Sequence, residues 1–459
     1  MPTPQPNKSK LNLYDAVMMV SGSMIGSGVF IVAADMTRIL HHPAWVLLCW
    51  AIAGGITLLA ALCYGELAAM MPKAGGQYAY IRRAFGSATA FVYGWSVFTV
   101  IQTGVIAAVA VAFSKFMGVL FPAIDQPIKA VSFLGNWRFS DLTTVLVIWF
   151  LSVIQMFGMQ YGQYIQRIFT GIKILALIGI IAVGAGYYLL YSKTGVISQN
   201  YNPHQNLSWH SLLGMFSMAL IGALFSSDAW NNITFLAGDI ERPKRNVPLA
   251  LIMGVSLVTI LYIACNGIYF LLVPAETIAG APQDRVATVV LSQIWGPSAV
   301  GIMALLIVIS TFGCNNGLIF GGARMIQAMA QEGLFFKYFS YDNARGMPSR
   351  AMNIQAIWAS ILALSGSYGS LLDYCTVTSL AFYAVTVSGL LYLRIKDPLA
   401  ERPYQTPAYP ILPLLYIFMV LLIIGFLACN KPLQVGFGLG LSALGLPIYQ
   451  LFIKSNRHV

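Results

Sequence analysis

The stretch SGSMIGSGVF, residues 21–30, places three glycines and three serines inside an apolar segment. That segment, residues 12–40, is long enough to cross a bilayer, because a hydrocarbon core about 30 Å thick needs roughly 20 residues of helix. Gly22 and Gly26 stand at GxxxG spacing, which allows two helices to pack closely. Alternatively, the glycines interrupt the helix near the middle of the membrane, and the freed N–H and C=O groups then need a cavity or a ligand. A second interruption elsewhere in the chain would favour the discontinuous helix.

The composition is that of an integral membrane protein. Hydrophobic residues make up 58% of the 459 residues, charged residues only 9%, and the mean hydropathy is +0.74. The chain contains twelve apolar runs of membrane-spanning length, each continuously apolar rather than alternating as in a barrel strand. Their approximate extents are 12–40, 44–71, 86–120, 141–159, 163–191, 211–240, 247–274, 288–331, 351–367, 370–394, 410–429 and 432–453. The sequence therefore predicts an all-α membrane protein with 12 transmembrane helices.

Lysine and arginine are distributed unevenly between the two sides of the predicted membrane. With the N-terminus inside, eighteen of the 26 face the cytoplasm, seven face outwards, and one, Lys173, lies within the membrane. This bias follows the positive-inside rule and predicts that both termini are cytoplasmic. It also accounts for the net charge of +11, so nucleic-acid binding is not expected.

The polar residues do not form the cluster that a membrane enzyme or a metal site needs. All five histidines lie in predicted loops or near the C-terminus. The six cysteines lie within or at the edges of predicted helices, at spacings unlike zinc or redox motifs. We therefore predict no enzymatic activity, no metal and no cofactor.

A second interruption occurs five helices after the first, where residues 223–235 read ALFSSDAWNNITF. Its serines, aspartate and asparagines break an apolar run in the same way as the glycines of helix one. Interruptions in helices one and six predict two five-helix halves of opposite orientation, because an odd number of helices inverts the second half. The halves would be residues 12–191 and 211–394, and residues 410–453 would add helices eleven and twelve.

Five motifs carry a resemblance to a known family. They are SGSMIGSGVF in helix one, YGELAAMMPKAGGQYAYIRRAFG after helix two, GDIERPKRNVPLA after helix six, FGCNNGLIFGGARMIQAMAQEGLFF in helix eight and RPYQTPAYPILPLL before helix eleven. Together they resemble the amino acid-polyamine-organocation superfamily, most closely its L-type amino acid transporter branch and the bacterial serine/threonine exchangers in it. The resemblance spans nearly the whole chain. It implies a LeuT-type 5+5 inverted repeat that binds an amino acid between discontinuous helices 1 and 6.

The resemblance also implies where a zwitterion binds. The matching positions are Met24, Gly26, Ser27, Gly28, Phe225, Ser226, Asp228 and Asn231. The substrate carboxylate would meet N–H groups of the residues from Gly26 to Gly28, since the N-terminal end of a half-helix favours an anion. The ammonium would meet carbonyl groups at the two interruptions, and Phe225 resembles the aromatic gate that covers the substrate. The role of Asp228 is open, because a carboxylate there suits a cationic or polar substrate and relatives carry Asp or Gly.

Lys173 is the most informative charge. It lies roughly ten residues into helix five, too deep for its side chain to reach water easily, and burying a charge costs at least about 2.5 kcal/mol. The resemblance places it where sodium-independent relatives keep a lysine near the sodium site of sodium-coupled ones. A fixed cation there implies exchange without an ion gradient. Alternatively, burial lets a lysine lose and regain a proton, which supports proton symport. Glu66 would join such a proton route or, as we expect, pair with polar groups of the inner loops.

The predicted function is sodium-independent transport of neutral L-amino acids by alternating access, most simply as an exchanger, in the cytoplasmic (inner) membrane of a prokaryote. The alternatives are a proton-coupled symporter and a non-transporting amino acid sensor on the same fold. Animal transporters of this branch join a heavy chain through a cysteine in the outer loop between helices three and four. Residues 121–140 contain no cysteine, so no disulfide-linked heavy chain is expected.

Overall fold

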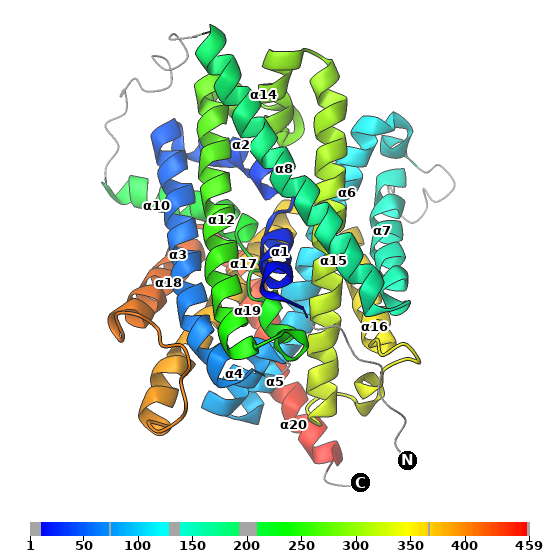
Figure 1. The fold of residues 1–459 in the computed structure, drawn as a ribbon, viewed down its shortest axis with the longest axis vertical. Coiled ribbons are helices and arrows are strands. Elements are labelled where there is room, and N and C mark those ends of the chain that lie inside the picture. Colours follow the sequence, from blue (N-terminus) through cyan, green and yellow to red (C-terminus); the bar gives the residue numbers. More distant parts are fainter. Residues whose placement is uncertain (1–10, 73–74, 128–137, 192–208, 366–367, 457–459) are drawn as a thin grey trace.

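The computed structural model describes residues 11–72, 75–127, 138–191, 209–365 and 368–456 (Figure 1). These residues form helices and loops, and within them the strand-like pairing is limited to two isolated bridges. Residues 128–137, which belong to the loop between predicted helices three and four, lie outside the described residues, so the structure does not bear on that part of the heavy-chain prediction.

The first part of the chain ends with a long helix, α8. Its elements are α1 (Leu13–Met24), α2 (Gly28–Leu40), α3 (Pro43–Met70), α4 (Gly76–Phe85), α5 (Ser87–Ser96), η1 (Val97–Ile101), α6 (Gln102–Leu120), η2 (Pro122–Asp125), α7 (Phe139–Met156) and α8 (Met159–Tyr191). The elements α5, η1 and α6 form one continuous span, Ser87–Leu120, in which η1 is a π-helical segment.

The second part begins at α10. Its elements are α10 (Trp209–Ser226), α11 (Asn232–Phe235), η4 (Ala237–Asp239), α12 (Pro243–Leu272), α13 (Ala275–Ala279), η5 (Pro282–Asp284), α14 (Val286–Trp295), α15 (Ser298–Gln331), η6 (Lys337–Ser340), α16 (Ser349–Ser365) and α17 (Tyr368–Lys396). The chain ends with α18 (Ile411–Asn430), α19 (Pro432–Ala443) and α20 (Gly445–Asn456).

Each of the twelve predicted runs contains helix, but the described residues support fewer full spans. Nine of their helices or continuous helical segments are long and apolar enough to cross a membrane, and the bent pair α1 and α2 would make a tenth. The apolar stretch Leu212–Ser226 of α10 and the 17-residue α16 are shorter than the shortest of these spans, which has 18 residues. The described helices therefore support the prediction of a multi-pass membrane protein, whereas the twelve transmembrane helices and the inverted repeat stay predictions.

One predicted run is divided. The apolar run 288–331 contains two helices, because α14 ends at Trp295 and α15 begins at Ser298. Gly296 between them has φ 64°, a left-handed conformation that glycine adopts without steric cost, and Pro297 cannot continue the hydrogen bonding of α14. The sequence signal for this division is the Gly-Pro pair, which lies inside an otherwise continuous apolar run.

Both predicted interruptions coincide with irregular backbone. The helix α1 ends at Met24, α2 begins at Gly28, and the two are bent by 41°. The helix α10 ends at Ser226 and α11 begins at Asn232, so residues 227–231 are irregular. We call these segments the helix-one break (residues 25–27) and the helix-six break (residues 227–231).

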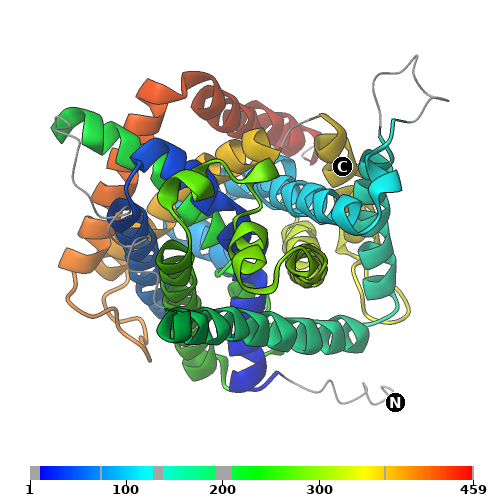
Figure 2. The ribbon, with the colours of Figure 1, turned by 90° about the horizontal axis from the view of Figure 1, so that it is seen from above.

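The two breaks lie in the interior of the molecule. Figure 1 shows α1 between α12 and α15, and α1 contacts both of these helices as well as α8. The half-helix α2 packs on α10, so the breaks face one another. Seen along the long axis, the orange and red helices α18 and α19 lie at the periphery, across the molecule from α8 (Figure 2).

Candidate functional site

The helix-one break is held by side chains from other helices. The Lys173 ammonium on α8, 2% exposed, donates to Gly22 O at 2.9 Å and to Ile25 O at 2.8 Å. On α15, the Ser310 hydroxyl lies 3.0 Å from Gly26 O and 3.3 Å from Ile25 O. The last turn of a helix leaves carbonyls without intrahelical partners, and these side chains satisfy them. The Lys173 ammonium is thus placed against the negative end of the α1 dipole, which favours a cation there.

A single tyrosine connects the two breaks. The Tyr262 hydroxyl on α12 lies 3.0 Å from Met24 O and 3.2 Å from Ser226 O. Because a phenol carries one hydrogen, it donates to one of these carbonyls at a time. The last carbonyls of α1 and α10 therefore converge on one hydroxyl, at a point where both helix dipoles present their negative ends.

The N-terminal end of α2 packs tightly on α10. No side chain caps the helix at Ser27, so the N–H groups of the first turn depend on other partners. A Cβ atom at Gly28 would overlap the hydroxymethyl group of Ser226, whereas one at Gly26 would only touch the Cys314 sulfur at 3.5 Å. Gly28 thus permits a close approach between the breaks. At Gly26 there is room for a Cβ atom, so no close approach depends on this glycine. Gly22 permits a close approach between α1 and α8, because a Cβ atom there would overlap Thr170 and Gln166 on α8.

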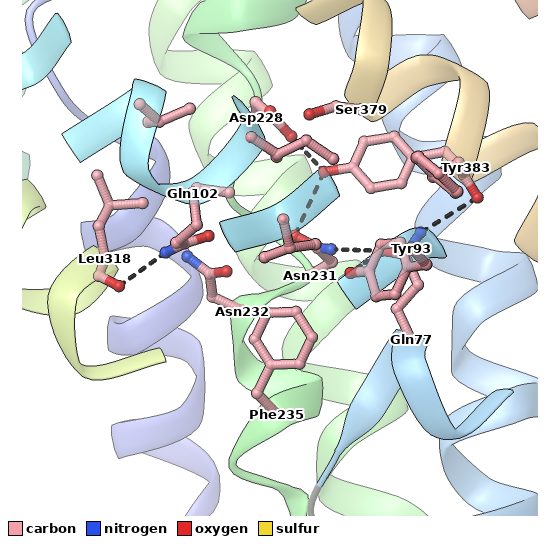
Figure 3. Close-up of a pocket in the computed structure, with 15 residues that line it drawn as sticks. Gln77, Tyr93, Gln102, Asp228, Asn231, Asn232, Phe235, Leu318, Ser379 and Tyr383 are labelled. Atoms are coloured by element: carbon pink, nitrogen blue, oxygen red, sulfur yellow. Dashed lines mark hydrogen bonds between the residues drawn. The ribbon is translucent and has the colours of Figure 1, made fainter. Parts of the chain in front are cut away.

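A small cavity with both polar and apolar walls adjoins the helix-six break (Figure 3). Its volume is about 20 Å³, room for about one water molecule. Polar side chains of α4, α5, α6, α11, α17 and the break line it together with apolar ones. The polar lining residues are Gln77, Tyr93, Gln102, Asp228, Asn231, Asn232, Ser379 and Tyr383. A second cavity of about 20 Å³ lies between α3, α10, α17 and α18, and it shares Asp228, Ser379 and Tyr383 with the first.

The polar groups of the first cavity form a hydrogen-bonded chain. The Tyr383 hydroxyl contacts Asp228 Oδ1 at 2.5 Å and Asn231 Oδ1 at 3.3 Å, as the dashed lines in Figure 3 show. Asn231 Nδ2 donates to Gln77 Oε1 at 2.9 Å. The partly buried Asp228 carboxylate thus accepts a hydrogen bond from a tyrosine hydroxyl and forms no ion pair in the part of the chain that the structure describes. Such a group can interact with a donor on a ligand.

The predicted binding residues fall into two groups. Asp228 and Asn231 line the first cavity. The others lie at the facing breaks and line neither cavity; they are Met24, Gly26, Ser27, Gly28, Phe225 and Ser226. Phe225 is 8% exposed, and its carbonyl accepts from the Asp228 N–H at 3.1 Å.

Glu66 lies apart from both cavities. Its fully buried carboxylate accepts from Arg394 Nε at 2.8 Å, from Arg394 Nη2 at 2.7 Å and from the Thr406 N–H at 2.7 Å. Arg402 Nε lies a further 3.3 Å from Oε1. This cluster ties α3 to α17 and to the loop before α18, an arrangement typical of a structural ion pair.

Several residues at the site were missed from sequence alone. They are Gln77, Tyr262, Ser310 and Tyr383. Nothing in the sequence separates the last three from packing residues, because each lies within an ordinary helical pattern. Gln77 offered the one signal, since it follows two glycines in a motif that carried the resemblance. Within the described residues, no group of three His, Cys, Asp or Glu side chains is arranged to hold a metal ion.

Comparisons with known proteins agree with this architecture. Residues 11–443 match a family described as amino acid permease. The b(0,+)-type amino acid transporter 1 of Homo sapiens is 29% identical over 417 residues, covering 90% of this chain and 82% of that protein. The Asc-type amino acid transporter 1 of Mus musculus is 27% identical over 458 residues, covering 97% and 81%. The large neutral amino acids transporter small subunit 2 of Homo sapiens is 26% identical over 455 residues, covering 97% and 80%.

Proposed function

Because the chain belongs to the amino acid permease family, and within it to the L-type amino acid transporters, we propose that it exchanges neutral L-amino acids across the cytoplasmic membrane by alternating access and without sodium. Amino acid transport is the activity that its relatives share. The proposal adds the ion dependence, the exchange mode and the substrate class.

The observation that carries the proposal is the position of Lys173. Its ammonium donates to two carbonyls at the end of α1, 2.9 Å and 2.8 Å away. A sodium ion at the same place would satisfy the same kind of carbonyl oxygens, since both are cations that replace water at a helix C-terminal end. A covalently attached cation cannot be released to either side of the membrane. Its presence therefore supports a cycle that needs no sodium gradient.

The facing breaks offer both poles that a zwitterion needs. The positive end of the α2 dipole suits the substrate carboxylate, with Gly26, Ser27 and Gly28 as its backbone donors. The carbonyls of Met24 and Ser226 suit the ammonium, because each oxygen has a second lone pair besides the one that faces Tyr262. Phe225 is the proposed gate. Backbone recognition of this kind selects α-amino acids and leaves the side chain to be read by the surrounding cavities.

Binding requires the centre of the molecule to open. Each cavity has a volume of about 20 Å³, whereas small-molecule sites usually offer about 300–1,000 Å³. Ion pairs also connect elements at both ends of α3. Arg38 on α2 pairs with Asp284 at one end, and Glu66 pairs with Arg394 at the other. Alternate opening of the two ends would give the substrate access to each side in turn.

Proton symport is the alternative that a specific observation favours. Asp228 is partly buried and forms no ion pair with an arginine or lysine among the described residues, so it is a candidate proton carrier beside the cavity. Lys173 is the other candidate proton carrier. An amino acid sensor would bind substrate in the same way and move none of it, so flux separates the sensor from both transporters.

We infer that the chain has no disulfide-linked partner. One relative is by its printed name a small subunit, which makes that protein part of a larger assembly. In this chain, residues 121–140 contain no cysteine. Five of the six cysteines are buried, and the exposed Cys429 lies at the end of α18. Orientation with both termini in the cytoplasm rests on the distribution of lysine and arginine.

The test is the ion dependence of uptake by purified protein in proteoliposomes. Labelled neutral amino acids are offered with sodium, with choline in its place, and with an inward proton gradient. We expect equal uptake in sodium and choline and no stimulation by the proton gradient. Uptake that requires sodium would overturn the role of Lys173, and accumulation driven by the proton gradient would replace exchange by symport.

A further inference from the structure

Gln77 forms the centre of a buried hydrogen-bond network between four elements. It lies in the first turn of α4 and has no exposed surface. Its Nε2 donates to Phe382 O at 3.1 Å and to Thr386 Oγ1 at 2.9 Å, both on α17. Its Oε1 accepts from the Tyr93 hydroxyl at 3.0 Å, on α5, and from Asn231 Nδ2 at 2.9 Å, in the helix-six break. Every polar atom of this amide is therefore satisfied.

The direction of these hydrogen bonds is fixed by one backbone carbonyl. Phe382 O can only accept, so the NH₂ group of Gln77 must face it. Gln77 Oε1 then faces the opposite way, towards Asn231 (Figure 3). Asn231 must in turn present its NH₂ group to Gln77, which leaves Asn231 Oδ1 towards Tyr383. A reversed Asn231 amide would place two oxygen acceptors against each other.

The position of Gln77 is itself constrained by its neighbour. Gly76 has φ 46°, and a Cβ atom there would overlap Thr234 Oγ1 and approach Phe235 at the helix-six end. The start of α4 is thus pressed against α11, directly beside the break that carries Asn231. A residue held this firmly can orient a partner with little loss of conformational entropy on binding.

We propose that Gln77 is a positioning residue for substrate binding, because it fixes the Asn231 amide at the wall of the cavity with Oδ1 turned to Tyr383. Gln77 also lines this cavity, but the role proposed for it is to hold Asn231 and not to bind the substrate itself. This inference rests on the proposed amino acid site and deepens it by assigning a role to α4, an element outside the two broken helices.

The experiment is equilibrium binding of a labelled neutral amino acid to purified protein, with the thermal unfolding midpoint Tm measured on the same samples. Gln77→Met keeps the length of the side chain and removes its hydrogen bonds. We expect the Kd to rise about fivefold, the factor for one net hydrogen bond. In an Asn231→Ala background the same change should leave Kd within about twofold, because the partner is already gone.

Thr386→Val is the matched control. It removes one acceptor of Gln77 Nε2 but leaves Phe382 O to hold the amide, so Kd should stay within about twofold of the native protein while Tm falls. The proposal is overturned if Gln77→Met leaves Kd unchanged, if it raises Kd equally in the Asn231→Ala background, or if Thr386→Val raises Kd as much. Should Gln77→Met not fold, Gln77→Asn, whose amide is one methylene too short to reach Asn231, is judged by the same three criteria.

Failure of this inference is distinguishable from failure of the proposed function. Binding is measured without transport, so a protein that binds amino acids and moves none would refute exchange and leave the Kd comparison intact. Conversely, normal exchange with an unaffected Kd in Gln77→Met would refute the positioning role alone.

Discussion

Lys173 illustrates how one buried charge constrains function. A functional role for Lys173 is predicted from sequence, because a charge at this depth in the membrane is costly. The structure shows its hydrogen-bond partners at the end of α1. Neither carbonyl partner could be identified from sequence, because Gly22 and Ile25 lie about 150 residues away and contribute only backbone oxygens.

The first prediction concerns this contact. Lys173→Met keeps much of the side-chain volume and removes two charge-assisted hydrogen bonds, each worth about 1.5–3 kcal/mol. We expect amino acid uptake to fall at least about tenfold. The matched control is Lys244→Met, since Lys244 is half-exposed and pairs with the exposed Glu401. Equal uptake by the two variants would contradict the role of Lys173.

The second prediction concerns the close approach of the two breaks. A Cβ atom at Gly28 would overlap Ser226, so Gly28→Ala should destabilise the protein by about 1–3 kcal/mol, the usual cost of overpacking. Ser226→Gly removes the overlapping atoms and should restore part of the loss. Gly26→Ala has room and should leave Tm nearly unchanged. Thermal unfolding of Gly28→Ala, of Gly28→Ala combined with Ser226→Gly, and of Gly26→Ala checks this, and a Gly28→Ala protein as stable as Gly26→Ala would show that the breaks do not touch.

At the scale of elements, the helix-six break contains a residue in an unfavourable conformation. Ala229 has φ 65°, in the left-handed region that costs a residue with a Cβ about 1–2 kcal/mol. Ala229→Gly removes this cost but gains about 0.5–1 kcal/mol of unfolded-state freedom, so the net gain is up to about 1 kcal/mol. Ala229→Val should instead destabilise. A Tm that is highest with Gly at position 229, lower with Ala and lowest with Val would support a strained break. The reverse order would exclude it.

The cluster of Glu66 gives a prediction for the packing of α3 against α17. Glu66→Gln leaves Arg394 and Arg402 without their carboxylate, and breaking a buried pair typically costs about 3–5 kcal/mol. We expect a marked fall in Tm with no change in the ion dependence of uptake. Glu401→Gln, in an exposed pair, should have little effect. Loss of proton-stimulated uptake in Glu66→Gln without loss of stability would instead place Glu66 in a proton route.

Elements and their interruptions follow from sequence more readily than the contacts between them. Continuous apolar runs predict the helices, and the Gly-Ser and Ser-Asp-Asn stretches predict both breaks, because polar or flexible backbone in a membrane needs a special environment. The network around Gln77 could not be predicted in this way. Gln77 and Thr386 are 309 residues apart, and Glu66 and Arg394 are 328 residues apart. Only the folded arrangement of helices brings such pairs together.

In the whole molecule, the two cavities beside the helix-six break are too small for an amino acid, and ion pairs lie towards both ends of α3. Arg38 with Asp284 and Glu66 with Arg394 connect elements at opposite ends of α3, and each cavity holds about 20 Å³. In the proposed alternating-access cycle, an occupied centre opens to one side at a time. If Lys173 serves as the fixed cation, no ion is released during the cycle to help the empty protein return to its starting conformation. That return is then favoured when a second amino acid is bound.

The measurement that tests this account most directly is uptake of a labelled neutral amino acid into sodium-free proteoliposomes that are either empty or preloaded with unlabelled amino acid. We expect rapid uptake into preloaded vesicles and little into empty ones, with both lost in Lys173→Met. Equal uptake into empty and preloaded vesicles, or preloaded exchange that survives in Lys173→Met, would contradict it.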